Sequence, residues 1–267
     1  MNRAILGLEL RRSRALIGWL SLVLVAYGAV MALMYPILKE NSKLLEDYLK
    51  IMPQAFLKAF GMEGSLTDPG VFFTTYVASW MWPIIAGLGG ILIATRPVAA
   101  DADRGFLEVP LSAPVARARY LLIAIGGQLL ALALLAASAV AGILVVGLLV
   151  GAEFDAVHFT LAGAAAFCFA AAIVGPTSLV AVLTLNRGLT GASLAGVLVV
   201  MYLLEVIAKI QPDLGWLGRL SLMHYFNTTP IVDAGSWPLA DAAVLSGVAV
   251  LGWAGAVWLF RRRDLAT

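Results

Sequence analysis

Ionisable side chains inside apolar segments are the first candidates for chemistry in this sequence, because a charge in an apolar environment is costly. Only Glu205 comes close to such a position, near the end of an apolar stretch, and Lys209 follows four residues later. Residues at that spacing share one face of a helix and can form an ion pair. Two interpretations stay open: a structural ion pair at the outer boundary of the membrane that the chain spans, and an outer gate or substrate contact.

The other reactive residue types form no catalytic or metal-binding pattern. His158 and His224 lie on separate loops, and we expect no metal site from them. Cys168 is the single cysteine, which excludes an internal disulfide. There is no Ser/His/Asp or H-E-x-x-H arrangement, no G-x-x-x-x-G-K-[ST] and no Gly-Lys pair, so the chain lacks a P-loop for ATP phosphates. We therefore expect no catalytic residues, metal or cofactor here, and no enzyme activity in this chain.

Composition places the chain in a membrane. Of the 267 residues, 61% are hydrophobic and 13% are charged, and the mean hydropathy is +0.93. A soluble domain of this size needs a more polar surface, so we expect lipid to solvate one domain covering 1–267. The net charge of +2 is too small to imply a nucleic-acid partner.

Six stretches are long enough to cross the hydrocarbon layer as helices, which takes roughly 20 apolar residues. The predicted fold class is therefore an all-α integral membrane protein with six transmembrane helices. The first stretch is too long for the apolar region of a signal peptide, so we expect it to be retained. The six predicted spans are 15–37, 74–95, 120–150, 158–184, 189–209 and 239–260. Prolines inside the second and fourth, Pro83 and Pro176, predict kinks.

Basic residues predict the orientation, because cytoplasmic segments carry an excess of Lys and Arg. Six spans place both termini on one side. The basic residues expected on that side are Arg3, Arg11, Arg12, Arg14, Arg96, Arg104, Arg117, Arg119, Arg187, Arg261, Arg262 and Arg263. The basic residues expected on the other side are Lys39, Lys43, Lys50, Lys58, Lys209 and Arg219, and acidic residues of the long first loop offset its lysines. We expect a multi-pass protein of a bacterial inner (plasma) membrane, with both termini cytoplasmic.

Two non-membrane segments have amphipathic patterns. The N-terminal stretch 5–12 mixes apolar and charged residues and predicts a short interfacial helix. In the outer loop 38–73, apolar residues recur at three- or four-residue steps, which predicts a helix on the outer leaflet, broken by Pro53. This helix is either a structural lid or a substrate contact. The recurring residues are Leu45, Tyr48, Leu49, Met52, Phe56 and Phe60.

The cytoplasmic segment 96–119 carries large apolar residues among many charges. Phe106, Leu107 and Leu111 stand between acidic and basic residues. Apolar anchors ringed by charge are typical of protein interfaces, so a docking element for a cytoplasmic partner is one interpretation. Contact with lipid headgroups is the other.

Three motifs, in order, resemble those of type-2 ABC transporter permeases. Residues 101–117, D-A-D-R-G-F-L-E-V-P-L-S-A-P-V-A-R, resemble the family's loop between spans two and three, which runs acidic-x-x-x-Gly-Thr-Leu-Glu, a Leu-rich turn, Ser or Thr, and Pro-x-x-Arg. Residues 221–227, S-L-M-H-Y-F-N, resemble its Ser-x-x-x-Tyr/Phe stretch. Residues 260–265, F-R-R-R-D-L, resemble its F-x-R-R-D-L ending.

The resemblance implies a coupling helix in this loop that docks on a cytoplasmic ATPase. Its contact core would run from Gly105 to Leu111, and Glu9 and Arg11 of the N-terminal helix would rest against the same ATPase. The segment 210–238 would form short outer helices before the last span. The implied coupling interface comprises Asp101, Asp103, Arg104, Gly105, Phe106, Leu107, Glu108, Leu111, Glu9 and Arg11.

The function implied by the resemblance is the permease subunit of an ABC exporter. Two cytoplasmic ATPase subunits would bind ATP and magnesium, and a second copy or a related permease would complete the path through the lipid. Because the spans carry mostly apolar, hydroxyl and aromatic side chains, a hydrophobic or amphipathic substrate is expected. Two alternatives stay open: an ATP-independent secondary transporter or channel, and a non-transporting membrane anchor or sensor subunit.

Overall fold

Six long helices dominate the fold. The computed structural model describes residues 2–53, 57, 65–103, 105, 116–152 and 154–262, among which there is no strand. Six helices are long and apolar enough to cross a membrane, which confirms the predicted all-α, six-span fold of a multi-pass membrane protein. Their bounds are Arg11–Glu40, Pro69–Asp103, Arg117–Leu149, Ala156–Thr184, Arg187–Ile210 and Leu239–Arg262.

The first span belongs to a longer helix than the sequence pattern predicts. α1 runs unbroken over Asn2–Glu40, so the stretch 5–12 continues into the span and forms no separate interfacial helix. No proline or glycine lies between residues 8 and 17, and extending an existing helix adds one hydrogen bond per residue. At 1.5 Å per residue, α1 is about 58 Å long, roughly twice the hydrocarbon thickness, so part of it must extend beyond the apolar layer.

A second, shorter helix follows α1 directly. The side-chain amide of Asn41 donates to the carbonyl of Ile37, 2.8 Å away, at the end of α1. α2 then runs over Ser42–Ile51 and ends before Pro53, which agrees with the predicted helix in this loop and its predicted break. The predicted continuation through Phe56 and Phe60 lies outside the described residues.

The second span is one helical rod made of five consecutive pieces. They are α4 (Pro69–Phe73), η1 (Thr74–Met81), α5 (Trp82–Thr95), η2 (Arg96–Ala100) and α6 (Asp101–Asp103). η1 and η2 are π-helical, with the wider i→i+5 hydrogen bonding. Pro83 follows η1 closely and Pro97 lies inside η2. Because proline lacks an N–H and crowds the preceding turn, local departure from α-helical bonding at these points is expected.

The rest of the chain alternates long spans with short helices. The long ones are α8 (Arg117–Leu149), α9 (Ala156–Thr184), α10 (Arg187–Ile210) and α12 (Leu239–Arg262). α9 continues through Pro176. Two 3₁₀ helices, η3 (Pro212–Leu220) and η4 (Leu222–Tyr225), and the short α11 (Thr229–Ala234) lie between α10 and α12. This agrees with the short helices that the family resemblance implies before the last span.

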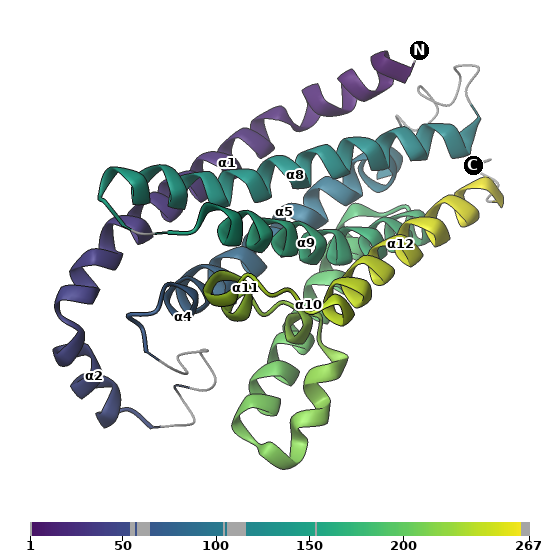
Figure 1. Ribbon diagram of the computed structural model, residues 1–267. Helices are drawn as coiled ribbons and strands as arrows, with labels where there is room; N and C mark the ends of the chain where they lie inside the picture. The colour runs from purple at the N-terminus through teal and green to yellow at the C-terminus, as the bar shows by residue number, and fades with distance from the viewer. Residues whose placement is uncertain are drawn as a thin grey trace.

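The helices pack around α9, which contacts α5, α8 and α12 (Figure 1). α1 lies along α8, while α10 and the returning η3 extend away from the group. In the most apolar stretch of α10, only 11% is buried, which is the smallest share among the six spans. The start of α1 and the end of α12 lie at one end, which we call the proximal end, and we call the opposite end the distal end (Figure 1).

Glycines let the main helix pairs approach closely. A Cβ on Gly252 of α12 would lie 2.3 Å from the carbonyl carbon of Gly175 in α9, and a Cβ on Gly142 of α8 would lie 2.4 Å from the carbonyl oxygen of Val25 in α1. No side chain fits in such gaps. Because lipid is as apolar as the side chains, membrane helices gain stability from close packing of this kind.

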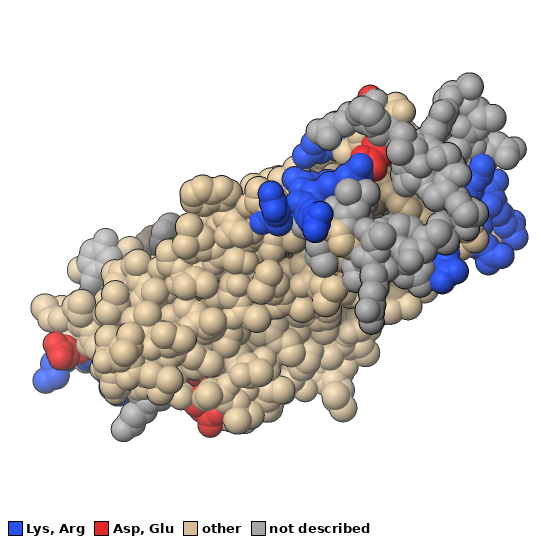
Figure 2. Space-filling model, turned by 90° about the horizontal axis from the view of Figure 1, so that it is seen from above, with Lys and Arg blue, Asp and Glu red and all other residues tan. Residues whose placement is uncertain are grey.

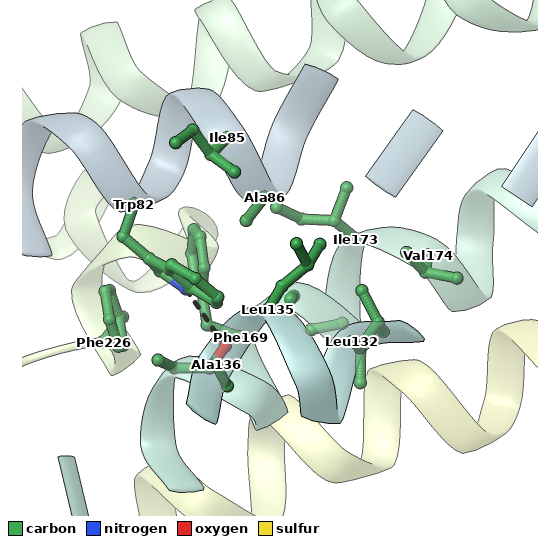
Figure 3. Packing of buried hydrophobic residues seen from close by; sticks show 14 of the residues in the cluster. Trp82, Ile85, Ala86, Leu132, Leu135, Ala136, Phe169, Ile173, Val174 and Phe226 are labelled. Carbon is green, nitrogen blue, oxygen red and sulfur yellow. Dashed lines mark hydrogen bonds between the residues drawn. The ribbon is translucent and has the colours of Figure 1, made fainter. Parts of the chain in front are cut away.

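The largest buried cluster lies between α5, α8 and α9 (Figure 3). The indole Nε1 of Trp82 donates to the carbonyl of Ala166, 3.1 Å away, which links α5 to α9. Phe169 stacks on Phe226, with ring centroids 4.7 Å apart. Phe226 follows η4, so the short helices before the last span are anchored in the core.

Charged residues are concentrated at the ends of the molecule. Figure 2 shows a middle surface almost free of charge and a gathering of Lys and Arg at the end that carries the termini. Arg11, Arg12 and Arg14 lie in the first half of α1, Arg117 and Arg119 begin α8, and Arg261 and Arg262 end α12. This separation agrees with an apolar layer around the middle of the helices.

We expect Gly252→Ala to destabilise the chain, because the added methyl group overlaps the backbone of α9. Overpacking of this kind typically costs about 1–3 kcal/mol. Gly247→Ala is the matched control: it lies on the same helix, and a methyl group added there meets nothing within 4 Å. Thermal unfolding in detergent measures both. Equal stability of the two variants would contradict the close α9–α12 contact.

A second prediction concerns the start of α9. The carboxylate of Asp155 accepts from the backbone N–H groups of His158, at 3.1 Å, and Val157, at 2.8 Å. These two hydrogen bonds, helped by the charge of His158, lower the pKa of Asp155 below its ordinary value. A lowered pKa in the folded state means that the stabilisation is complete above the ordinary Asp pKa and is lost as the pH falls through the lowered value. Asp155→Asn should keep the cap and remove this acid-side loss, whereas Asp155→Ala should lose the cap at all pH values; thermal unfolding against pH distinguishes them.

Candidate functional site

Two carboxylates bind the base of the 101–117 loop to other helices at the proximal end. Asp101, at the end of the second span, lies 2.9 Å from a guanidinium nitrogen of Arg12 in α1. The Asp101 side chain is 9% exposed and that of Arg12 is 42% exposed. Asp103 accepts from the backbone N–H of Arg187, 2.7 Å away, at the first residue of α10. The negative charge of Asp103 also lies at the positive end of the α10 helix dipole, which is a favourable arrangement.

Further contacts strengthen this base. The hydroxyl of Tyr120 in α8 donates to the carbonyl of Pro97, 2.9 Å away. The guanidinium of Arg96 donates to the carbonyl of Arg12. The end of the second span is therefore joined to α1, α8 and α10 within a few residues of the loop.

The structure describes only part of the predicted coupling interface. Asp101 is buried within this chain, so its carboxylate acts on Arg12 and leaves little surface for a partner. Asp103 and Gly105 are exposed, and Gly105 has a φ of +69°, a left-handed conformation that suits glycine after a helix end. Arg11 is exposed on α1. Outside the described residues, or with undescribed side chains, are Arg104, Phe106, Leu107, Glu108, Leu111 and Glu9.

A cavity of about 560 Å³ lies toward the distal end, between η1, α10 and the short helices that follow α10. Its walls mix hydroxyl, amide, charged and aromatic side chains. The lining residues are Thr74, Ala78, Ser79, Trp80, Pro83, Tyr202, Glu205, Val206, Ala208, Lys209, Gly215, Met223, His224, Phe226, Asn227 and Thr229. Sequence spacing alone could not predict this cavity, because its walls come from three separate segments.

Glu205 and Lys209 both line this cavity. The Lys209 Nζ lies 3.5 Å from Oε1 of Glu205. His224 joins them from η4, with Nδ1 3.8 Å from Oε2 of Glu205. Glu205 is 8% exposed, and its Oε2 has no hydrogen-bond partner among the described residues. The histidine lies 19 positions away in sequence, so no spacing rule connects it to Glu205.

An apolar groove of about 540 Å³ continues from the cavity between α5 and α10. Five residues line both spaces: Ser79, Trp80, Pro83, Tyr202 and Met223. The rest of the groove is walled by Ile84, Gly87, Leu88, Ile91, Ala195, Leu198 and Val199. Polar and apolar spaces thus adjoin along one wall.

The described residues contain no group of three or more His, Cys, Asp or Glu side chains that could hold a metal ion. The Nδ1 of His158 lies 3.0 Å from the carbonyl of Val232, a contact between α9 and α11 that is structural in character. Cys168 lies in α9 with its sulfur 3.8 Å from the hydroxyl of Ser246.

No protein-family model matches this chain, and no curated protein has a sequence similar enough to count as a relative. Its function must therefore be inferred from the sequence motifs and from the geometry of the two ends.

We expect Arg12→Gln to destabilise the chain, because it leaves the buried carboxylate of Asp101 without its cation. The loss should be roughly 1–3 kcal/mol, between the values for exposed and fully buried ion pairs. Arg14→Gln removes an exposed charge from the same helix and serves as the control. Adding Asp101→Asn to Arg12→Gln should restore part of the stability. Chemical or thermal unfolding in detergent gives the values, and an Arg12→Gln variant as stable as Arg14→Gln would rule out the role given to this pair.

Proposed function

We propose that this chain is the permease subunit of an ABC exporter, forming a substrate path as a dimer and driven by separate ATP-hydrolysing subunits. In this proposal the proximal end is cytoplasmic and the membrane is the bacterial inner membrane. The motif resemblance in the 101–117 loop supports this class of protein. The way in which the base of that loop is attached to the helices gives the proposal a mechanism.

The observation that carries the proposal is the double attachment of the second span just before this loop. Asp101 is paired with Arg12 of α1, and Asp103 accepts from the first N–H of α10. A force applied to the loop by a cytoplasmic partner would act on α1 and α10 together with the second span. A free connector would absorb the same force by bending, because a loop has few fixed contacts.

α10 connects this attachment to the distal cavity. Its first residue, Arg187, contacts Asp103, and Glu205 of the cavity lies 18 residues further along, about 27 Å at the α-helical rise. α10 is also the least buried span, so few packed side chains hold it in one position. A rigid-body movement of α10 against α5 would change the groove between them, which is the kind of switch that ATP-driven closure of partner subunits can bias.

The partners in this proposal are those that the family resemblance implies. Two cytoplasmic ATPases would bind ATP and magnesium and dock on Gly105 to Leu111, with Glu9 and Arg11 of α1 against the same surface. A second copy of this chain, or a related permease, would complete the path, and membrane lipid would surround the apolar middle. The spaces described above suit a hydrophobic or amphipathic substrate.

Charge reversal in the loop tests the proposal. Tagged chain isolated from its own source should bring with it an ATPase containing Walker and signature motifs. Glu108→Lys and Arg104→Glu should each weaken that association about tenfold or more, since charges around a docking contact fix its register and exclude wrong pairings. Lys43→Glu, an exposed charge reversal on α2 at the distal end, should leave the association unchanged. The measurements are pull-down with purified ATPase and ATP-dependent transport; absence of any associated ATPase, with transport unaffected by both reversals, would refute the proposal.

The cluster of Glu205, Lys209 and His224 favours a second candidate, a transporter driven by an ion gradient, because ionisable groups in a cavity are common in such proteins. Flux into vesicles under a proton or sodium gradient without ATP would support this candidate over the first. A non-transporting anchor or sensor subunit would instead bind an ATPase through the same loop and show no ATPase stimulation by any substrate.

A further inference from the structure

The structure points to a binding site for a lipophilic organic cation, made of the distal cavity and the apolar groove that continues from it. The positive head would lie near Glu205, and the apolar body would lie between α5 and α10. That this site serves in transport depends on the proposed function, but binding itself does not.

The two spaces together have the shape of an amphiphile. The cavity and the groove, about 560 and 540 Å³, are each within the range of small-molecule sites, and they share a wall that includes Trp80 and Tyr202. The charged and amide side chains all lie on the cavity side. The groove side is walled by aliphatic residues such as Ile91, Leu198 and Val199. A molecule with one polar end and one apolar end fits this division, whereas a hydrated ion or a sugar would leave the groove empty.

The burial and contacts of Glu205 indicate the sign of the charge on the ligand's polar end. Glu205 is nine-tenths buried, and its Oε1 forms an ion pair with Lys209 at 3.5 Å. Its Oε2 accepts no hydrogen bond from the described residues. The side chain of Lys209 is 39% exposed, so water weakens its attraction to the carboxylate. His224 Nδ1, 3.8 Å from Oε2, lies beyond hydrogen-bonding distance. A buried carboxylate with these two incomplete contacts favours a further cation near it. Because Oε2 itself is enclosed beside Gly218 and His224, the ligand would act on Oε1 or at longer range through the field of the carboxylate.

Aromatic residues at the junction of the two spaces support the same sign of charge. Trp80 and Tyr202 line both spaces, and indole and phenol rings attract cations through the negative faces of their π systems. An organic anion would meet these rings and the carboxylate together. Lys209 and His224 would favour an anion, but both already lie beside Glu205.

The groove gives such a ligand a route from the lipid. Ile84, Leu88 and Val199 are 51%, 60% and 58% exposed on the surface of the chain, within the apolar part of α5 and α10. A lipophilic cation first partitions into the membrane, and from there the apolar body can enter between the two helices without crossing water.

A pair of ions of similar size and opposite charge tests the proposal. The purified full chain in lipid nanodiscs is titrated with tetraphenylphosphonium and with tetraphenylborate, using equilibrium dialysis against protein-free nanodiscs as the reference. We expect saturable binding of the cation. Glu205→Gln should weaken cation binding about tenfold and leave anion binding unchanged or stronger. Asp213→Asn, which removes an exposed carboxylate on η3, should leave cation binding unchanged.

A second pair of variants tests the groove without touching the carboxylate. Val199→Trp should fill the groove and weaken cation binding, whereas Leu203→Trp, an exposed position on the same helix that lines neither space, should not. Thermal unfolding of each variant confirms that it is folded. Cation binding that survives both Glu205→Gln and Val199→Trp overturns the proposal, as does a Glu205→Gln variant that loses cation and anion binding equally.

These results are distinguishable from failure of the proposed function. The binding measurement contains no ATPase, so cation binding with the expected variant pattern supports the site even if no ATPase associates. If only the binding-site proposal is wrong, the chain will associate with an ATPase and will not bind the cation.

Discussion

Close backbone contact between helices is the constraint on which the rest of this structure depends. In lipid, apolar side chains gain little by leaving their surroundings, so helices associate through dispersion contacts and a few hydrogen bonds at short range. Gly175 and Gly252 bring α9 and α12 into backbone contact, and Gly142 does the same for α8 against α1. α9 can therefore pack against α5, α8 and α12 together, with Trp82 of α5 hydrogen-bonded to its backbone. The two candidate functional regions are built on the ends of this core.

α9 and α10 differ strongly in how much of each helix is buried. In the most apolar stretch of α9, 67% is buried, compared with 11% in that of α10. α10 is nevertheless held at its start by Asp103, and near its end Glu205 lies beside Lys209 and His224. In the proposed transport cycle, a movement of α10 would exchange few buried side-chain contacts. The same helix forms one wall of both the cavity and the groove, so its position determines the size of both.

Hydropathy predicts the spans well because the hydrocarbon layer imposes a minimum length on each helix whatever the neighbours are. The sequence pattern predicts the start of α1 poorly. The amphipathic pattern of residues 5–12 suggests a separate helix, whereas in the structure these residues continue into the first span as part of α1. The i,i+4 spacing of Glu205 and Lys209 is readable from the chain, because both lie on one helix. The place of His224 is not, because its approach to Glu205 depends on η3 returning alongside α10 after the turn at Gln211.

The sequence by itself determined that this is a multi-pass membrane protein, with six apolar segments, basic residues near the ends, no nucleotide-binding motif and a charged loop resembling that of ABC permeases. These properties are local, because span length, charge bias and short motifs each occupy one stretch of chain. The tertiary structure decided which charges meet. Asp101 is paired with Arg12, 89 residues away, and Glu205 lies in a cavity formed by three segments. Such pairings depend on how helices approach one another, and that is set by where glycine allows backbones to touch.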